Sequence, residues 1–544
     1  MHPSSKIEVE LVELSGHVVA KGSWGATLRA NCLYQCAHLA KPGHRCRLLQ
    51  GSKEITPITP LAALDLSSST FIQVVWLSIS AADKHLQSQA FAAIKADGSV
   101  VTWGKAVGGG DSSAVAPLLT EGVVQVCANI QAFAAIKADG SVVTWGSSSF
   151  GGDSSAVAPL LTEGVVQVYG NYGDFAAIKA DGSVVTWGNA GGGGDSSAVA
   201  PLLTEGVVQL CGSTMAFAAI KADGSVVTWG SSSFGGDSSA VAPLLMEGVI
   251  QVCGITMALA AIKADGSVVT WGGGGDSSVV APLLTEGVVQ VSGTDRAFAA
   301  IKADGSVVTW GSSSFGGDFS AVAPLLTEGV VQVCANIQAF AAIKADGSVV
   351  TWGSSSFGGD SSAVAPLLTE GVVQVYGNYG AFAAIKADGS VVTWGDAAFG
   401  GDSSAVAPLL TEGVAQVYGN YSAFVAIKAD GSAVTWGSSS FGGDSSAVAP
   451  LLTQGVVQIC ANSRAFAAIK ADGSVVTWGE AVSGGDSSVV APLLTEGVVQ
   501  VSGTDRAFAA IKADGSVVTW GNAGDGGDSS AVAPLLMEGV VQVC

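Results

Sequence analysis

The segment Ala132-Phe133-Ala134-Ala135-Ile136-Lys137-Ala138-Asp139-Gly140-Ser141-Val142-Val143-Thr144-Trp145-Gly146 recurs, nearly letter for letter, eleven times in this chain of 544 residues. Nine of the ten intervals between successive copies are 42 residues, and the interval from Trp271 to Trp310 is 39. A fixed period of this length is typical of repeat architectures, in which each repeat buries its core against its neighbours. The sequence therefore predicts one array over residues 81–544, preceded by a separate segment over residues 1–80. The tryptophans that mark the copies are Trp103, Trp145, Trp187, Trp229, Trp271, Trp310, Trp352, Trp394, Trp436, Trp478 and Trp520.

Each copy predicts three short antiparallel strands. Residues 123–126 form a short apolar first strand, and residues 132–137 form a second one, whose side chains alternate between its two faces. Asp139-Gly140 is the signal for a two-residue hairpin, because glycine tolerates the positive φ of a type I′ turn. Residues 141–145 then return as the third strand, and a connector rich in glycine and serine leads to the next copy.

Three strands cannot bury both faces of their sheet alone, so the copies must pack against one another. Alanines on the second strand allow neighbouring sheets to approach closely, and one tryptophan per copy fills the wedge between them. Radial stacking of such sheets gives a β-propeller with few exposed edges. A parallel β-helix does not need an Asp-Gly hairpin in every turn, so the hairpins favour the propeller over the β-helix.

The repeated motif Ala-Ile-Lys-Ala-Asp-Gly-Ser-Val-Val-Thr-Trp-Gly resembles the core of the regulator-of-chromosome-condensation repeats. The compact connector is closer to that of the bacterial propeller-type β-lactamase inhibitor relatives. The resemblance implies a propeller that binds proteins. Two departures argue against nucleotide exchange on a small GTPase, which stays the alternative function. The array has no histidine beyond His85, where those repeats commonly have Gly-His, and it has no basic or shaped insertion.

Eleven copies are too many for one ring of the usual four to eight blades, so we expect two rings or an open spiral. The chain stops at residues 540–544, a first strand with no second, and the first copy lacks its usual first strand. The last strand is thus expected to complete the first blade. The alternative is that the natural chain continues beyond Cys544.

The first 80 residues predict a small α+β domain. Residues 7–12 and 18–20 form a hairpin, a helix follows over residues 28–40, and residues 46–51 and 70–77 form two more strands. This order, with the Arg47-Leu48-Leu49-Gln50-Gly51 strand and turn, resembles the ubiquitin-like fold. No Gly-Gly follows the last strand, so the resemblance implies a docking module linked to the ubiquitin system rather than a conjugated tag. Similar propellers occur in HECT-type ubiquitin ligases, but no catalytic HECT domain is found in this sequence. The alternative is a small cap on the array.

Charge and cysteine spacing exclude several classes of function. Residues 86–544 carry 15 Lys and Arg against 38 Asp and Glu, a surface that repels phosphate backbones, so we expect no nucleic-acid binding. No uncharged apolar run is long enough to span a membrane, and no secretory signal opens the chain, so we expect a protein of the cytoplasm, with the nucleus as the alternative. The cysteine position of the repeat is also filled by tyrosine and serine, which argues against metal ligands and disulfides. His38 and His44 near Cys32, Cys36 and Cys46 lack zinc-site spacing.

The copies differ mainly in two places, which are the turn between the first and second strands and the segment after Trp-Gly. Strand direction puts both at the same end of each sheet, so all variation is expected on one face of the disc. Loops on one face of a rigid scaffold are the usual place for binding, whereas no copy is singled out as catalytic. We therefore predict no enzyme activity, no cofactor and no metal, and protein partners bound by exposed aromatic and arginine side chains. These candidates are Phe150, Tyr172, Arg296, Phe357, Tyr379, Tyr421, Arg464 and Arg506.

Overall fold

The computed structural model describes residues 6–13, 18–25, 33, 37, 45–50, 53–55, 61, 64, 71–77 and 88–544. The chain forms two compact units, Met1–Asp83 and Lys84–Cys544.

The first unit contains one mixed five-stranded sheet with the strand order β2-β1-β5-β3-β4. The strands β1 (Lys6–Glu13) and β2 (Val18–Gly25) form the predicted hairpin, and β1 pairs in parallel with β5 (Phe71–Leu77). The strands β3 (Arg45–Gln50) and β4 (Lys53–Ile55) complete the sheet on the other side of β5. The predicted strands are thus confirmed, while β4 was not expected.

The predicted helix over residues 28–40 falls mostly outside the described residues. Within it, Leu33 and Ala37 are helical and fully buried, and they join the core formed by Leu11, Leu48 and Ile72. His38, His44, Cys32 and Cys36 lie outside the described residues. The likeness to the ubiquitin-like fold stays a prediction.

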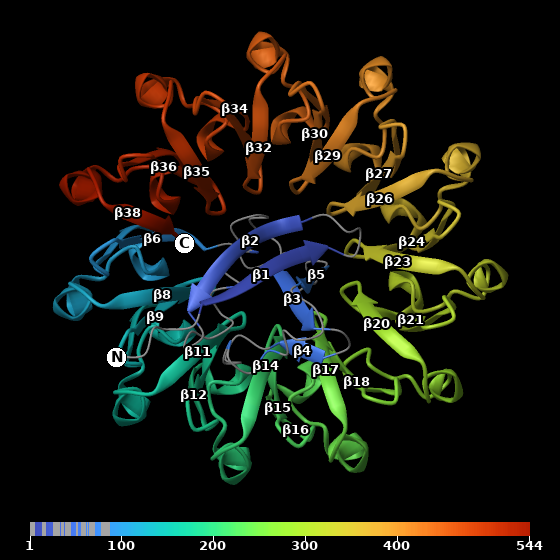
Figure 1. Cartoon of the computed structure of the whole chain (residues 1–544), viewed down its shortest axis with the longest axis horizontal. Helices are drawn as coiled ribbons and strands as arrows, with labels where there is room; N and C mark the ends of the chain where they lie inside the picture. Colours follow the sequence, from blue (N-terminus) through green and yellow to red (C-terminus); the bar gives the residue numbers. More distant parts are fainter. Residues whose placement is uncertain are drawn as a thin grey trace. The chain divides into compact units, whose positions relative to one another are not determined.

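The second unit is a ring of eleven three-stranded antiparallel sheets, or blades, as Figure 1 shows. In one representative blade the strands are β8 (Val123–Ala128), β9 (Ala132–Lys137) and β10 (Val142–Gly146). The register pairs Val126 with Ala135 and Phe133 with Trp145. The connector contains two short 3₁₀ helices, such as η5 (Ser148–Phe150) and η6 (Ser155–Leu160). The predicted three-stranded blade is therefore confirmed.

The same three strands recur in every blade. The first strands are β11 (Val165–Gly170), β14 (Val207–Ser213), β17 (Val249–Gly254), β20 (Val288–Gly293), β23 (Val330–Ala335), β26 (Val372–Gly377), β29 (Val414–Gly419), β32 (Val456–Ala461), β35 (Val498–Gly503) and β38 (Val540–Val543). The second strands are β6 (Ala90–Lys95), β12 (Asp174–Lys179), β15 (Ala216–Lys221), β18 (Ala258–Lys263), β21 (Ala297–Lys302), β24 (Ala339–Lys344), β27 (Ala381–Lys386), β30 (Ala423–Lys428), β33 (Ala465–Lys470) and β36 (Ala507–Lys512). The third strands are β7 (Val100–Gly104), β13 (Val184–Gly188), β16 (Val226–Gly230), β19 (Val268–Gly272), β22 (Val307–Gly311), β25 (Val349–Gly353), β28 (Val391–Gly395), β31 (Ala433–Gly437), β34 (Val475–Gly479) and β37 (Val517–Gly521).

The 3₁₀ helices of the remaining connectors also recur. Those that follow Trp-Gly are η3 (Ala106–Gly108), η7 (Ala190–Gly192), η9 (Ser232–Phe234), η12 (Ser313–Phe315), η14 (Ser355–Phe357), η16 (Ala397–Phe399), η18 (Ser439–Phe441), η20 (Ala481–Ser483) and η22 (Ala523–Asp525). Those that carry the proline are η4 (Ser113–Leu118), η8 (Ser197–Leu202), η10 (Ser239–Leu245), η11 (Ala281–Leu283), η13 (Ala323–Leu325), η15 (Ser362–Leu367), η17 (Ser404–Leu409), η19 (Ser446–Leu451), η21 (Ser488–Leu493) and η23 (Ser530–Leu536).

Neighbouring blades pack through their second strands. Ala132, Ala134 and Ile136 of one blade form a buried cluster with Phe175 and Trp187 of the next. The small alanines let the two sheets approach closely, as expected from the sequence. The indole Nε1 of the tryptophan also donates a hydrogen bond to a glycine carbonyl of the preceding connector, as Trp187 does to Gly151 at 3.0 Å.

The expectation of two rings or an open spiral was wrong, because the array closes as a single ring. The last strand, β38, pairs with β6 of the first blade, and Phe91 and Trp103 of that blade pack against Ala507 and Ala509. All the interfaces between blades use nearly the same residues, so the rotation from one blade to the next about the ring axis is nearly the same at each interface.

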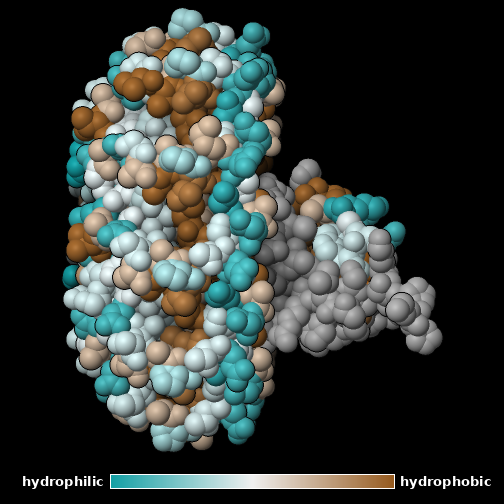
Figure 2. Space-filling view, turned by 90° about the vertical axis from the view of Figure 1, so that its left-hand side faces the viewer, coloured by the Kyte–Doolittle hydropathy of each residue, from teal (hydrophilic) through white to brown (hydrophobic). Residues whose placement is uncertain are grey.

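The rim of the ring exposes apolar side chains in a regular pattern. The 3₁₀ helices that carry the proline lie at the periphery in Figure 1. Leucines in these helices, such as Leu118 and Leu367, are 53% exposed, and valines of the first strands, such as Val373, are exposed too. Figure 2 shows hydrophobic residues that recur along the part of the rim that faces the viewer. Because this pattern repeats from blade to blade, it distinguishes no single blade.

The shortened copy offers an internal test of the bond between blades. Trp310 follows the 39-residue interval, and its Nε1 is buried without a hydrogen-bond partner, whereas Trp394 Nε1 donates to Gly358 O at 3.0 Å. Loss of a hydrogen bond that leaves a buried carbonyl unsatisfied costs about 1–3 kcal/mol. We therefore expect Trp394→Phe to lower the free energy of unfolding by roughly that much more than Trp310→Phe. Urea denaturation of both variants measures the difference, and equal losses would contradict the role given to this bond.

Candidate functional site

The two variable segments of each blade lie together, at the end of the sheet opposite the Asp-Gly hairpin. In one blade, Asn129 Nδ2 donates to Phe150 O at 2.7 Å, and Ser147 N donates to Gln131 O at 2.9 Å. The first strands end toward the centre of the ring in Figure 1, so these segments surround its axis. We call this set of turns and segments after Trp-Gly the variable face.

An asparagine holds the variable turn rigid in six blades. Asn378 Oδ1 accepts hydrogen bonds from the backbone N–H groups of Gly380 and Ala381, while its Nδ2 donates to Phe399 O at 2.6 Å. One side chain thus closes the turn and ties it to the segment that carries Phe399. Because the backbone on both sides is fixed, the aromatic side chains there are presented in a defined arrangement. The asparagines are Asn129, Asn171, Asn336, Asn378, Asn420 and Asn462.

Five aromatic rings from successive blades form a continuous stack, which we call the aromatic ladder: Phe357, Tyr379, Phe399, Tyr421 and Phe441. Tyr379 lies at the centre, with ring centroids 6.1 Å from Phe357, 5.3 Å from Phe399 and 4.1 Å from Tyr421. Tyr421 contacts Phe441 at 6.0 Å and is 41% exposed, while the other four rings are half-buried. The ladder is the largest aromatic cluster on the variable face.

Arg464 extends the ladder into a charged region. Its guanidinium lies over the ring of Phe441, with Cζ 5.3 Å from the centroid, and it forms an ion pair with Glu480 at 3.0 Å. Partial burial of Glu480 opposes ionisation, but the hydrogen bonds from Ser483 and Arg464 and the charge of Arg464 lower its pKa. One arginine therefore links the aromatic and the charged parts of the face.

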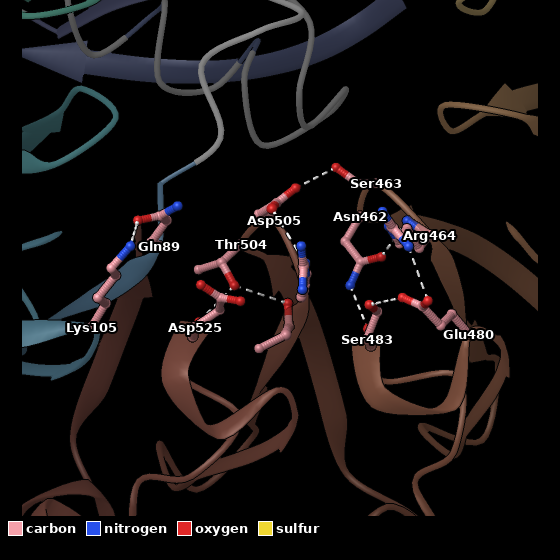
Figure 3. Close-up of polar contacts among 12 residues, drawn as sticks. Gln89, Lys105, Asn462, Ser463, Arg464, Glu480, Ser483, Thr504, Asp505 and Asp525 are labelled. Atoms are coloured by element: carbon pink, nitrogen blue, oxygen red, sulfur yellow. Dashed lines mark hydrogen bonds and ion pairs between the residues drawn. The ribbon is translucent and has the colours of Figure 1, made fainter.

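The charged region continues over the next blades, as Figure 3 shows. Asp505 Oδ1 accepts a hydrogen bond from Ser463 at 2.6 Å, and Asp505 Oδ2 lies 3.7 Å from Arg506 Nε. Partial burial, together with the charge of Asp505, raises the pKa of Asp525. Lys105 Nζ donates to Gln89 Oε1 at 2.6 Å.

The acidity of the array does not lie on this face. The repeated positions carry 32 of the 38 acidic and 11 of the 15 basic residues; of the six other acidic residues Asp174 is buried in β12, which leaves five acidic and four basic residues on the variable face. The aspartates and most of the lysines at the repeated positions form hydrogen bonds within their own blades and connectors. Asp139 Oδ1 accepts from Ser141 N at 2.9 Å and from Ser141 Oγ at 2.7 Å, and Lys137 Nζ donates to Leu118 O at 3.2 Å. The bonds from Ser141 lower the pKa of Asp139.

The structure brings four of the eight predicted residues together, namely Phe357, Tyr379, Tyr421 and Arg464. The others lie elsewhere on the variable face. Phe150 and Tyr172 form a separate pair with centroids 5.9 Å apart, and Arg296 lies over Phe315 at 5.5 Å. The expectation that all the aromatic candidates are exposed was wrong for Phe150, Phe357 and Tyr379, which are half-buried because the rings pack on one another.

Sequence reasoning missed Phe399, Phe441, Glu480 and Asp174. The signal for Phe399 and Phe441 was present, since both occupy the repeat position of Phe150 and Phe357. Asp174 is the only acidic residue at a position where every other copy has alanine. Glu480 is identified only through its contact with Arg464, 16 residues away in the sequence.

Metal binding and disulfides find no support among the described residues. Within those ranges, no group of three histidine, cysteine or acidic side chains is arranged to hold a metal ion. The cysteines of the repeat form no disulfide there, and Cys334 Sγ instead donates to Val375 O of the next blade. No helix in the described part of the chain is long and apolar enough to span a bilayer.

Comparison with known proteins gave likenesses of structure only. No family model and no curated protein matches the chain. The structure is similar to Prp20p of Saccharomyces cerevisiae, studied for its binding to Gsp1p and histones, at 15% identity over 59% of this chain and 83% of that one, with a TM-score of 0.28. It is also similar to the ectodomain of the receptor kinase CR4 of Physcomitrella patens (15% identity, 49% and 70% of the chains, TM-score 0.27) and to the computationally designed protein Ika8 (12%, 66% and 96%, 0.25). Such TM-scores support no functional argument.

The pair Tyr379 and Tyr421 allows a test of the ladder geometry. Burial, a hydrogen bond with Tyr379 and the charge of the Tyr379 phenolate raise the pKa of Tyr421 to about 12. We expect Tyr379→Phe to lower this pKa, but not to its ordinary value, because burial remains. An NMR titration of ¹³C-labelled tyrosine measures the shift. An unchanged pKa would show that the two hydroxyls do not interact.

Proposed function

We propose that this protein is a non-enzymatic scaffold that binds other proteins through the variable face of its ring. The observation that carries the proposal is the aromatic ladder, since tyrosine and phenylalanine clusters with an adjoining arginine are the usual anchors of protein interfaces. The ladder is partly exposed, and the asparagines of its turns fix its geometry, so little side-chain freedom is lost on binding.

The distribution of charge supports the same proposal. The variable face carries nearly balanced charges, whereas the repeated positions are strongly acidic. The acidic side chains of the repeated positions therefore attract a basic partner and repel an acidic one. The specific contacts with that partner are made on the variable face, where the copies differ. The mixed charges around Arg464 and Asp505 add polar specificity beside an apolar anchor.

The absence of enzyme activity is part of the proposal. The repeated Asp, Ser and Lys side chains are engaged in hydrogen bonds that hold their own blades, as Asp139, Ser141 and Lys137 illustrate. On the variable face, the described residues include no histidine, and Arg464 and Arg506 form ion pairs with Glu480 and Asp505.

We further propose that residues 1–83 act as a docking module of the ubiquitin-like type. The hairpin, the parallel pairing of β1 with β5 and the buried Leu33 and Ala37 support this assignment. A link to the ubiquitin system through this module would be independent of the ring. Binding assays that compare residues 1–83, residues 84–544 and the full chain assign each partner to one unit.

The ladder predicts where a partner binds the ring. A photo-crosslinking residue placed at Tyr421 of the full chain identifies partners at the face. We expect Tyr379→Ala combined with Tyr421→Ala to weaken binding of such a partner at least tenfold, which corresponds to about 1.4 kcal/mol. Calorimetry or surface plasmon resonance measures the affinity.

The matched control is Leu367→Ala combined with Leu409→Ala, which removes two rim side chains, each 53% exposed, from the neighbourhood of the same blades. We expect less than a twofold change in affinity for this control. A partner that is sensitive to the rim variant and indifferent to the ladder variant would overturn the proposal. Stimulated nucleotide release from a small GTPase would instead favour the exchange function.

A further inference from the structure

One residue breaks the repeat in the middle of the core. Asp174 is the first residue of β12, where it pairs with Gly188 of β13, and its side chain is 1% exposed. The other ten copies place alanine there, as Ala90, Ala132, Ala216, Ala258, Ala297, Ala339, Ala381, Ala423, Ala465 and Ala507. A carboxyl group thus replaces a methyl group at a fully buried interface position.

The surroundings of this carboxyl are uncharged. Neither Oδ1 nor Oδ2 has a hydrogen-bond partner of ordinary geometry. The nearest polar groups are the Asn171 side chain and the backbones of Asn189 and Gly194. No charged side chain of the ring contributes to the ionisation of Asp174, and the titratable side chain of the same turn is that of Tyr172.

The space occupied by the Asp174 carboxyl is available because the residue opposite it, Gly192, has no side chain. A Cβ atom on Gly192 would lie 2.3 Å from Oδ2, closer than any side chain can approach. Six other copies have phenylalanine at this position, at Phe150, Phe234, Phe315, Phe357, Phe399 and Phe441. The carboxyl therefore lies directly beneath the segment Asn189–Gly194, which has glycine at its last four positions.

A buried carboxylate without a partner is unfavourable, whereas the neutral acid is tolerated. Burial raises the pKa of Asp174 to about 7, against weaker opposition from Asn171, Asn189 and Gly194. Because the pKa is higher in the folded than in the unfolded protein, the closed blade is favoured at low pH. That stabilisation is lost as the pH rises from about 4 to about 7.

We propose that Asp174 is a pH-sensitive latch, whose acid form holds the segment Asn189–Gly194 closed over β12 and whose ionised form opens it. Hydration of the carboxylate requires only that this glycine-rich segment lift, because the rest of the blade is held by its neighbours. The turn that precedes Asp174 carries the exposed Tyr172. Opening therefore alters one sector of the variable face while the other blades stay closed.

Hydrogen exchange measured by mass spectrometry on the full chain tests the latch. After correction for the intrinsic rate, we expect the protection of amides 189–194 to fall at least tenfold between pH 6 and pH 8. The equivalent amides 396–401, which follow Trp394, serve as a control within the same molecule and should keep their protection. In Asp174→Ala and Asp174→Asn, amides 189–194 should also keep it.

Alanine at position 174 reproduces the sequence of the other ten blades, so this variant has the native packing available to it. Two results would overturn the proposal. One is equal protection of amides 189–194 at both pH values in the unaltered protein. The other is the same loss of protection in Asp174→Ala, which would place the pH-sensitive group elsewhere.

Discussion

The contact between neighbouring blades determines the rest of this structure. On one side it presents Ala132, Ala134 and Ile136, and on the other it presents Phe175 and Trp187. The alanines set the distance between the sheets, the two stacked rings fill the space, and the indole N–H is satisfied by a glycine carbonyl of the preceding connector. Because this contact is repeated with almost no change, its geometry rather than any property of a single blade sets the size of the ring. Closure by β38 adds a further contact of the same kind.

The repeat separates the residues that build the ring from those that distinguish its parts. Asp139, Ser141 and Lys137 are examples of charged and polar groups that complete hairpins and connectors in each copy. The number of repeated aspartates and glutamates makes the protein acidic, but the hydrogen bonds of the aspartates stabilise the hairpins and connectors. In six of the turns that surround the axis, one asparagine side chain and the backbone hydrogen bonds of the turn hold the chain, so the neighbouring side chains are not needed for the fold. Substitution there changes the surface without changing the scaffold, which is the condition under which a binding face can diversify.

The sequence was sufficient to predict the blade, its three strands and the common location of the variable segments, because alternation, the Asp-Gly hairpin and strand direction are local properties. It was not sufficient to predict one ring rather than two, because the turn between blades depends on how closely Ala134 and Phe175 pack. It identified Tyr379 and Tyr421 individually, but not the ladder. Contacts of Tyr379 with Tyr421 and of Phe441 with Arg464 join different blades, and no spacing in the sequence indicates which neighbours meet.

The two halves of the array show how few changes create a distinct surface. Residues 169–173 and 376–380 share the turn Tyr-Gly-Asn-Tyr-Gly, yet Tyr172 has one aromatic neighbour in the variable face and Tyr379 has three. The difference follows from two positions, because Gly192 stands where the other half has Phe399 and Thr214 stands where it has Tyr421. The same glycine that removes a ring from one sector leaves room for Asp174 beneath it. On a scaffold fixed by identical interfaces, single substitutions therefore give one sector an aromatic anchor and the other a buried acid.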